Sequence, residues 1–255
     1  MRKSFFLALS ALLLAAPGSS SAQISLPGCT RPDHLAAPFV FVAVNGQCLD
    51  LSSLVTPLGT GWNFTAHLDL AAAVIDLHAV FDPDPSVTLS GSSVNLTSAA
   101  TTYVVLLGTP VVPDFYSSAS SALRLDVTSP TGTTTVGNSG TYPTFLSGYG
   151  TLDRELTNLG VDLGTGTCVA EGTLASTSCD LGSATREFEP AFYDNLEALL
   201  TYTQDNTASK VDFTGDVTLN AAAVTATPEP ATLGLVGLGL VVIGAACGKR
   251  RRSVT

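Results

Sequence analysis

Positive charge is scarce in this chain, above all between its two ends. The 255 residues include 11 Lys and Arg against 21 Asp and Glu. Residues 23–227 contain only five of the basic residues but 20 of the acidic ones, a formal charge of about −15. Nucleic acids and anionic lipids attract proteins through clustered Lys and Arg. We therefore expect neither as a partner of this central part.

Side chains suited to metal binding and catalysis are also few. The chain has three histidines, and it lacks a nucleophile elbow, a phosphate-cradling loop, a dinucleotide fingerprint and an EF-hand loop. In extended chain, His67 would share a polar face with Asp69, and Asp76 with His78. These side chains could converge on a metal if the two strands pair, although solvent-facing polar residues are the commoner outcome. We predict no catalytic residue, no bound metal and no enzyme activity.

Calcium and sugars are the ligands that composition leaves open. Carboxylates lie in or near predicted turns at 82–84 and 212–216, where an exported β-domain could bind calcium. Aromatic rings could stack on sugars, and the candidates are Trp62, Tyr103, Tyr116, Tyr142 and Tyr149. Of these, Trp62 falls on an apolar strand face, so we expect it in the core.

Cysteine is scarce too, but its number in the central part is even. Of the five cysteines, Cys247 lies in the C-terminal apolar run, and the other four lie within residues 23–227. An even count in an exported chain suggests disulfides, and four cysteines allow three connectivities. Neighbours in sequence meet most easily, so we favour Cys29–Cys48 and Cys168–Cys179. Zinc binding is disfavoured because no close C-x-x-C pair occurs.

Long apolar runs occur at the two ends of the chain. Two basic residues precede an apolar stretch at 5–16, and small residues at 20–22 fit a cleavage site. We predict a signal peptide over 1–22, recognised by the Sec translocon and removed by signal peptidase. An N-terminal membrane anchor and lipoprotein processing at Cys29 are the alternatives.

The C-terminal run is longer, and positive charge follows it. Residues 231–248 carry no charged side chain and would extend about 27 Å as a helix, close to the hydrocarbon thickness of a bilayer. We predict a transmembrane helix here. Because basic residues stay on the cytoplasmic side, the body lies outside the inner membrane. These membrane-stop residues are Lys249, Arg250, Arg251 and Arg252.

A tripeptide bracketed by prolines stands directly before this run: Pro228, Glu229 and Pro230. With the apolar span and the basic tail in this order, residues 227–252 resemble the PEP-CTERM sorting signal of exported bacterial proteins. The resemblance implies recognition of the tripeptide by exosortase, an integral-membrane cysteine protease proposed to act like a sortase, with cleavage at or near it. It also implies a Gram-negative type envelope and an association with exopolysaccharide or biofilm. The prolines keep the backbone extended and open to a protease.

Most of the central part alternates between apolar and polar residues. From Trp62 to Leu70 the even positions are apolar, and 75–82, 123–128 and 211–219 follow the same period. This period is typical of half-buried antiparallel strands. Further strands are expected at 39–44, 86–89, 94–97, 102–107 and 168–174, and turns at 45–46, 82–85, 90–91 and 137–140.

Short strands at close spacing favour an all-β antiparallel sandwich of jelly-roll or immunoglobulin-like type. One segment departs from the period of two. Residues 190–203 place Phe192, Leu196 and Leu200 at helical spacing after Pro190, which predicts a short amphipathic helix.

Together these features predict four regions. They are a signal peptide (1–22), an exported domain (23–220), a stalk (221–227) and a sorting signal (228–252) with its motif at 228–230. We expect an inner-membrane-anchored precursor that exosortase transfers to the cell surface or the medium. A structural or exopolysaccharide-associated role is the leading interpretation. A carbohydrate- or calcium-binding adhesion module is the alternative, followed by a secreted hydrolase and by a permanent membrane protein that is never processed.

Overall fold

The computed structural model describes residues 24, 26–32, 35–152 and 155–222. All but Ala222 belong to a unit that ends at Ala221, and the description concerns this unit. Its strands are β1 (Phe39–Val44), β2 (Gln47–Asp50), β3 (Thr56–Leu58), β4 (Gly61–Asp69), β5 (Ala73–Asp82), β6 (Ser86–Asn95), β7 (Thr101–Ser129), β8 (Thr134–Gly137), β9 (Leu146–Leu152), β10 (Glu155–Asn158), β11 (Thr167–Ala170), β12 (Ala175–Gln204) and β13 (Lys210–Ala221). Within the described ranges, the one helical element is the 3-10 turn Ser52–Leu54.

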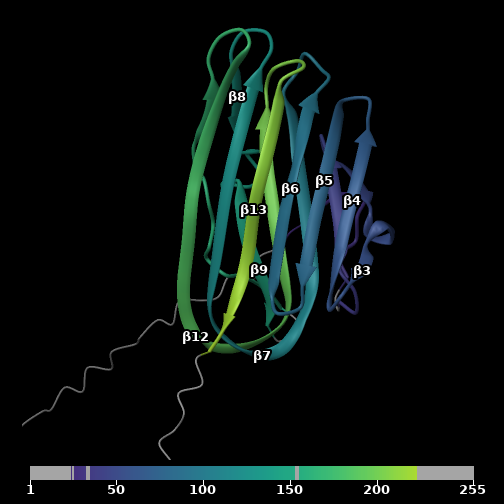
Figure 1. The fold of residues 1–255 in the computed structure, drawn as a ribbon, viewed down its shortest axis with the longest axis vertical. Helices are drawn as coiled ribbons and strands as arrows, with labels where there is room; N and C mark the ends of the chain where they lie inside the picture. The colour runs from purple at the N-terminus through teal and green to yellow at the C-terminus, as the bar shows by residue number, and fades with distance from the viewer. Residues whose placement is uncertain (1–23, 25, 33–34, 153–154, 223–255) are drawn as a thin grey trace, which may run out of the picture. The chain divides into compact units, whose positions relative to one another are not determined.

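Two strands are far longer than the rest and build two layers. β7 has 29 residues and β12 has 30, and they pair with each other along most of their length. The β13 layer has the order β12–β7–β13–β6–β5–β4–β3 and uses residues 175–187 of β12 and 116–129 of β7. The β1 layer has the order β10–β9–β12–β7–β1–β2 and uses the other halves. Figure 1 shows the two long ribbons curving round the lower end of the domain.

The bend between the layers follows from local sequence. β7 has Pro110 and Pro113 at its bend, and β12 has Pro190. Proline cannot donate a ladder hydrogen bond, and the register between the strands shifts around 187–191 and 193–195. Each long strand therefore leaves one layer and enters the other, and both layers contribute side chains to one core. Across that core, the rings of Tyr202 and Phe213 have centroids 6.2 Å apart.

The β13 layer alternates as the sequence predicts. In β5 the side chains of Ala73, Ile75, Leu77, Ala79 and Phe81 are buried, whereas Asp76 and His78 are exposed. Their register against β4 pairs Phe64 with Ala79 and His67 with Asp76. One face of this layer thus packs on the core and the other faces solvent.

The β1 layer is buried on both faces. Every residue of β1 is buried. Its even-numbered residues face the core between the layers, while Phe39, Phe41 and Ala43 face outward. Outward-facing residues of β7, β9 and β12 continue this second apolar cluster, and the N-terminal segment covers it through Ile24, Leu26, Cys29 and Leu35.

Several sequence predictions are wrong in detail. The strand expected at 168–174 ends at Ala170, and the one expected at 94–97 is the end of β6. The predicted helix at 190–203 lies within β12. Residues 195–202 are buried throughout, and their even positions are apolar, whereas Leu199 interrupts the polar residues of the other face. Spacings of four and eight also fit a period of two, which is why Leu196 and Leu200 share the inner face. The predicted turn at Ser90-Gly91 lies inside β6, where a Cβ at Gly91 would stand 2.2 Å from the Asp76 carbonyl oxygen.

The all-β antiparallel prediction is confirmed, and the jelly-roll or immunoglobulin-like assignment stays a prediction. No helix in the described part of the chain is long and apolar enough to cross a membrane. The signal peptide (1–22), the sorting motif (228–230), the predicted transmembrane helix (231–248) and the basic tail (249–252) lie outside the described residues.

Candidate functional site

The last strand carries the chain toward the predicted sorting signal. β13 lies between β7 and β6, and its final residue, Ala221, pairs with Tyr116 at the bend of β7. The Leu219 amide donates to the Pro85 carbonyl at 3.1 Å, which ties this end of β13 to the β5–β6 turn. Six residues, 222–227, separate β13 from Pro228. The described domain thus ends at the bend of β7, six residues before the tripeptide in the sequence.

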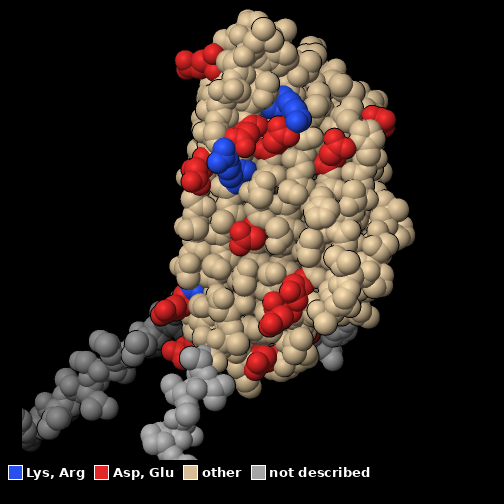
Figure 2. All heavy atoms as spheres, in the orientation of Figure 1, with Lys and Arg blue, Asp and Glu red and all other residues tan. Residues whose placement is uncertain are grey.

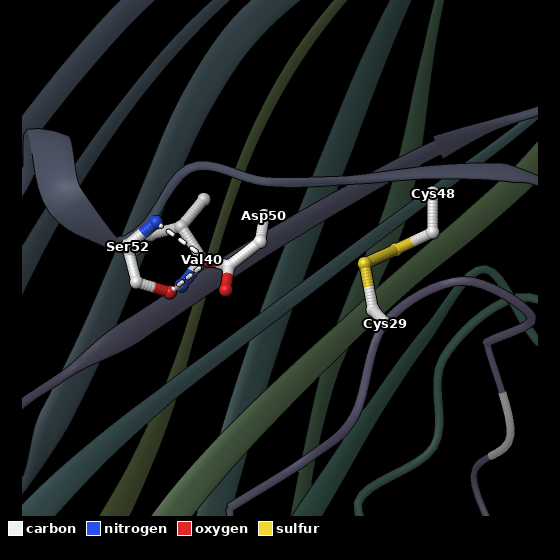
Figure 3. Close-up of a disulfide and its surroundings, with 5 residues drawn as sticks. All are labelled: Cys29, Val40, Cys48, Asp50 and Ser52. Atoms are coloured by element: carbon white, nitrogen blue, oxygen red, sulfur yellow. Dashed lines mark hydrogen bonds between the residues drawn. A yellow bond between two sulfur atoms is a disulfide. The ribbon is translucent and has the colours of Figure 1, made fainter.

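The N-terminal segment is attached to the β1 layer by a disulfide. Cys29 and Cys48 form this bond, which joins the segment to β2 (Figure 3). Beside it, the Val40 amide donates to Ser52 Oγ at 3.1 Å, and Ser52 Oγ donates to Asp50 Oδ1 at 2.6 Å. The segment from Ile24 to Leu35, which carries Cys29, is called here the N-terminal arm.

The second disulfide joins the two layers at an edge. Cys168 lies in β11, which pairs with β8, and β8 in turn pairs with β12 near Thr203. Its partner Cys179 lies in the part of β12 that belongs to the β13 layer. Both disulfides are the ones that sequence proximity favoured, and all four cysteines of the central part are therefore used in cross-links.

A buried ion pair, which sequence reasoning missed, anchors the arm. Arg31 Nε donates to Glu197 Oε1 at 2.7 Å, and Arg31 Nη2 donates to Thr151 Oγ1 at 2.9 Å. The side chain of Glu197 is fully buried and that of Arg31 is 19% exposed. Burial raises the pKa of Glu197, and Arg31 opposes this effect. Among the residues that the structure describes, Glu197 Oε2 has no hydrogen-bond partner. The two residues are 166 positions apart, so no local pattern signals the pair.

The predicted histidine cluster forms only in part. His67 Nδ1 lies 2.6 Å from Asp76 Oδ1, and His67 Nε2 lies 3.4 Å from Asp69 Oδ2, on the exposed face of the β13 layer. The hydrogen bond to Asp76 raises the pKa of His67, helped by the charge of Asp69. His78 takes no part in these contacts. In the ranges that the structure describes, no three His, Cys, Asp or Glu side chains are placed to bind a metal ion.

The two acidic segments considered for calcium are not gathered into one site. The Asp84 amide donates to Asp82 Oδ1 at 3.0 Å, so this carboxylate closes its own turn. Asp212 pairs with Lys210 at 2.6 Å within β13, and Asp216 lies farther along the same extended strand. Figure 2 shows the exposed face of the β13 layer, with acidic side chains spread over it and few basic ones among them.

The aromatic candidates separate into core and surface. Tyr103, Tyr116 and Tyr149 are buried, and Trp62 is half-buried against the core, as predicted for it. Tyr142 is half-exposed and lines a cleft of about 380 Å³ outside the β1 layer. Apolar side chains and small polar groups share this cleft: Leu26, Pro27, Ala43, Asn45, Gly46, Thr102, Val104, Ser139 and Thr141.

Comparison with known proteins identifies the C-terminal segment. Residues 226–252 match the family model described as the PEP-CTERM protein-sorting motif. The chain therefore carries this motif, which marks an exported protein that is membrane-anchored before it is sorted. The motif also implies processing by exosortase, a membrane protein.

The comparisons add little for the central part. No curated protein matches the chain. One solved structure, described as TmCBM61 in complex with beta-1,4-galactotriose, matches at 9% sequence identity with a TM-score of 0.23. The match covers 63% of this chain and 88% of that one. A similarity of this size carries no argument about fold or ligand.

Proposed function

We propose that the chain is a non-enzymatic envelope or extracellular-matrix protein, exported in an unfolded state and then released or attached at the cell surface by exosortase. The match of residues 226–252 to the sorting motif is the observation that carries this proposal. The described domain supports this proposal in one respect. Its last strand, β13, ends at Ala221, and six residues separate that strand from Pro228.

Two properties of the domain are compatible with a location outside the cytoplasm. Its two disulfides are typical of an oxidising compartment, where they persist. Its negative charge keeps it soluble and repels anionic polymers, so any association with exopolysaccharide would rely on neutral sugars or on bridging cations. A structural role in the matrix of a biofilm is compatible with both properties.

The termini of the mature protein test this proposal. Intact-mass spectrometry of protein from the native host should find a chain that begins near Gln23 and ends near Pro228–Pro230. Replacing Pro228, Glu229 and Pro230 by alanine should leave the basic tail attached and the protein in the inner membrane. Pro130→Ala, in a turn of the domain, is the matched control and should be processed normally. An intact tail at residues 249–252 in the mature wild-type protein would refute sorting.

The Tyr142 cleft favours a second candidate function, the binding of a neutral polysaccharide. A half-exposed aromatic ring beside hydroxyl and amide groups can stack on a sugar while hydrogen-bonding its hydroxyls. Affinity electrophoresis of the full-length protein through gels containing the host's exopolysaccharide should show retardation, which Tyr142→Ala abolishes. Tyr→Ala at this half-exposed position should leave the fold intact. Equal mobility of both proteins would refute polysaccharide binding at this cleft.

A further inference from the structure

The bends of β7 and β12 expose an apolar surface at the end of the domain. Phe115 pairs with Phe192 across the two strands, and their rings meet edge to face with centroids 6.0 Å apart. These side chains are 57% and 46% exposed, and that of Val112, three residues before Phe115 in the same bend, is 54% exposed. This surface, defined by Val112, Phe115 and Phe192, is called here the bend tip. Large exposed apolar side chains that cluster are typical of interaction sites.

The bend tip is held rigidly. The Val112 amide donates to the Pro83 carbonyl at 2.9 Å, and Tyr116 Oη donates to the Val112 carbonyl at 2.6 Å. Behind Phe192, the ring of Phe188 meets that of Tyr193 edge to face at 5.7 Å. A rigid aromatic surface loses little conformational entropy when it binds, which suits it to recognition.

Acidic residues are frequent in the segments that meet at the tip. The described residues of the two bends (110–116 and 186–195) and of the β5–β6 turn (82–85) include six acids and one basic residue, Arg186. The acids are Asp82, Asp84, Asp114, Glu187, Glu189 and Asp194. Negative charge in these segments repels anionic lipid headgroups and a second copy of the same tip, and it attracts a partner with a basic rim.

The tether places this tip next to the enzyme that reads the tail. Ala221 pairs with Tyr116, the neighbour of Phe115, so the chain leaves the domain at the bend tip. Seven extended steps separate Ala221 from Pro228 and cover at most about 25 Å, at ~3.3–3.6 Å each. While Pro228 occupies the active site of the sorting protease, Ala221 at the bend must therefore lie within about 25 Å of that site.

We propose that the bend tip docks on the outer surface of the membrane-embedded sorting protease, in an apolar depression with a basic rim. Docking would present residues 222–230 for cleavage. This proposal rests on the proposed function. The sorting motif would supply recognition by sequence. The bend tip would raise the local concentration of residues 222–230 at the active site of the protease.

Processing rates test the docking. Pulse–chase labelling in the native host should show that Phe115→Ala combined with Phe192→Ala slows conversion of the full-length chain by about tenfold, since two aromatic anchors are lost. Leu174→Ala is the matched control. Leu174 is 82% exposed in the turn before β12, where Ala175 pairs with Ser129 at the far end of β7 from the bend. It should be processed at the wild-type rate. Equal thermal midpoints of the three proteins verify that they fold.

Site-specific cross-linking identifies the partner. A photoreactive phenylalanine analogue at position 115 of the full-length chain should yield an adduct with an epitope-tagged sorting protease, and the analogue at position 174 should not. An adduct with lipid alone, with a second copy of the chain, or with nothing would overturn the proposal, as would normal processing of the double variant. If the wild-type chain itself keeps its tail, the proposed function fails instead, and the two failures are thus distinguishable.

Discussion

The two layers share one core but differ in what covers their outward faces. The β13 layer turns His67, Asp76, Arg124 and Asp126 to solvent, and its charges pair at the surface. The β1 layer turns Phe39, Phe41 and Leu199 outward, and the N-terminal arm covers them. A charged pair is exposed in one layer and buried in the other. An outward-facing side chain should therefore contribute more to the free energy of unfolding where another segment of chain covers it than where it faces solvent.

The largest expected effect on stability comes from removing one outward-facing ring from each layer. Phe41→Ala should lower the free energy of unfolding by about 4 kcal/mol, because the ring is buried beneath the arm and its loss leaves a cavity. His78→Ala, on the outward face of β5, should leave it nearly unchanged. Urea unfolding followed by fluorescence measures both. A small effect at Phe41 would mean that the arm does not cover this face in solution.

Removing the arginine of the buried pair should have a slightly smaller effect on stability, and removing that of the exposed pair should have almost none. Arg31→Ala should cost about 3 kcal/mol, because it leaves the Glu197 carboxylate buried without a counter-charge. Arg124→Ala breaks an exposed pair with Asp126 and should not change the urea midpoint measurably. The combination of Arg31→Met with Glu197→Leu should recover most of the loss. Equal effects at Arg31 and Arg124 would contradict the difference in burial.

The pH dependence of stability should have opposite signs in the two layers. Burial raises the pKa of Glu197, so its contribution is present below its unfolded pKa of about 4.5 and is lost as pH rises through the folded value. Hydrogen bonds from Arg124 and Ser178 lower the pKa of Asp126, so its contribution is present above its unfolded pKa and is lost as pH falls. Urea midpoints across pH should show that Glu197→Gln flattens the decline toward neutral pH. Asp126→Asn should flatten the decline on the acid side instead, and no change in either slope would contradict these assignments.

The smallest effect concerns the exposed histidine. Asp76→Asn should lower the pKa of His67 toward its ordinary value of 6.5, because the hydrogen bond to this carboxylate is the main cause of the raised value. NMR titration of the His67 ring protons measures the shift, with Asp82→Asn as the control. A pKa of His67 that does not move would show that Asp69 alone sets it.

Sequence reasoning succeeded where the pattern is local. Strand β1 was predicted with its observed bounds, and the alternation in β4, β5 and β13 followed from a period that solvent on one side imposes. Both disulfides followed from proximity along the chain. Prediction failed at β12, because Leu199 interrupts the polar face and the spacing of Phe192, Leu196 and Leu200 fits a helix as well as a strand.

The remaining features depend on contacts between distant residues. Arg31 gives no sign in the sequence that it meets Glu197, because the two residues lie 166 positions apart. The exposure of Phe115 and Phe192 also depends on the bends, which turn otherwise ordinary strand residues away from both layers. The sorting motif is the opposite case, because its recognition depends on a contiguous tripeptide and the run that follows it.

The position of β13 has a consequence for when this protein can fold. The last strand of the domain inserts between β6 and β7, and β12, made just before it, joins both layers. A growing chain therefore lacks the strand that joins β6 to β7 until residues 210–221 have been made. The β13 layer can close only when nearly the whole domain is available, so an N-terminal fragment that stops before β13 cannot form it.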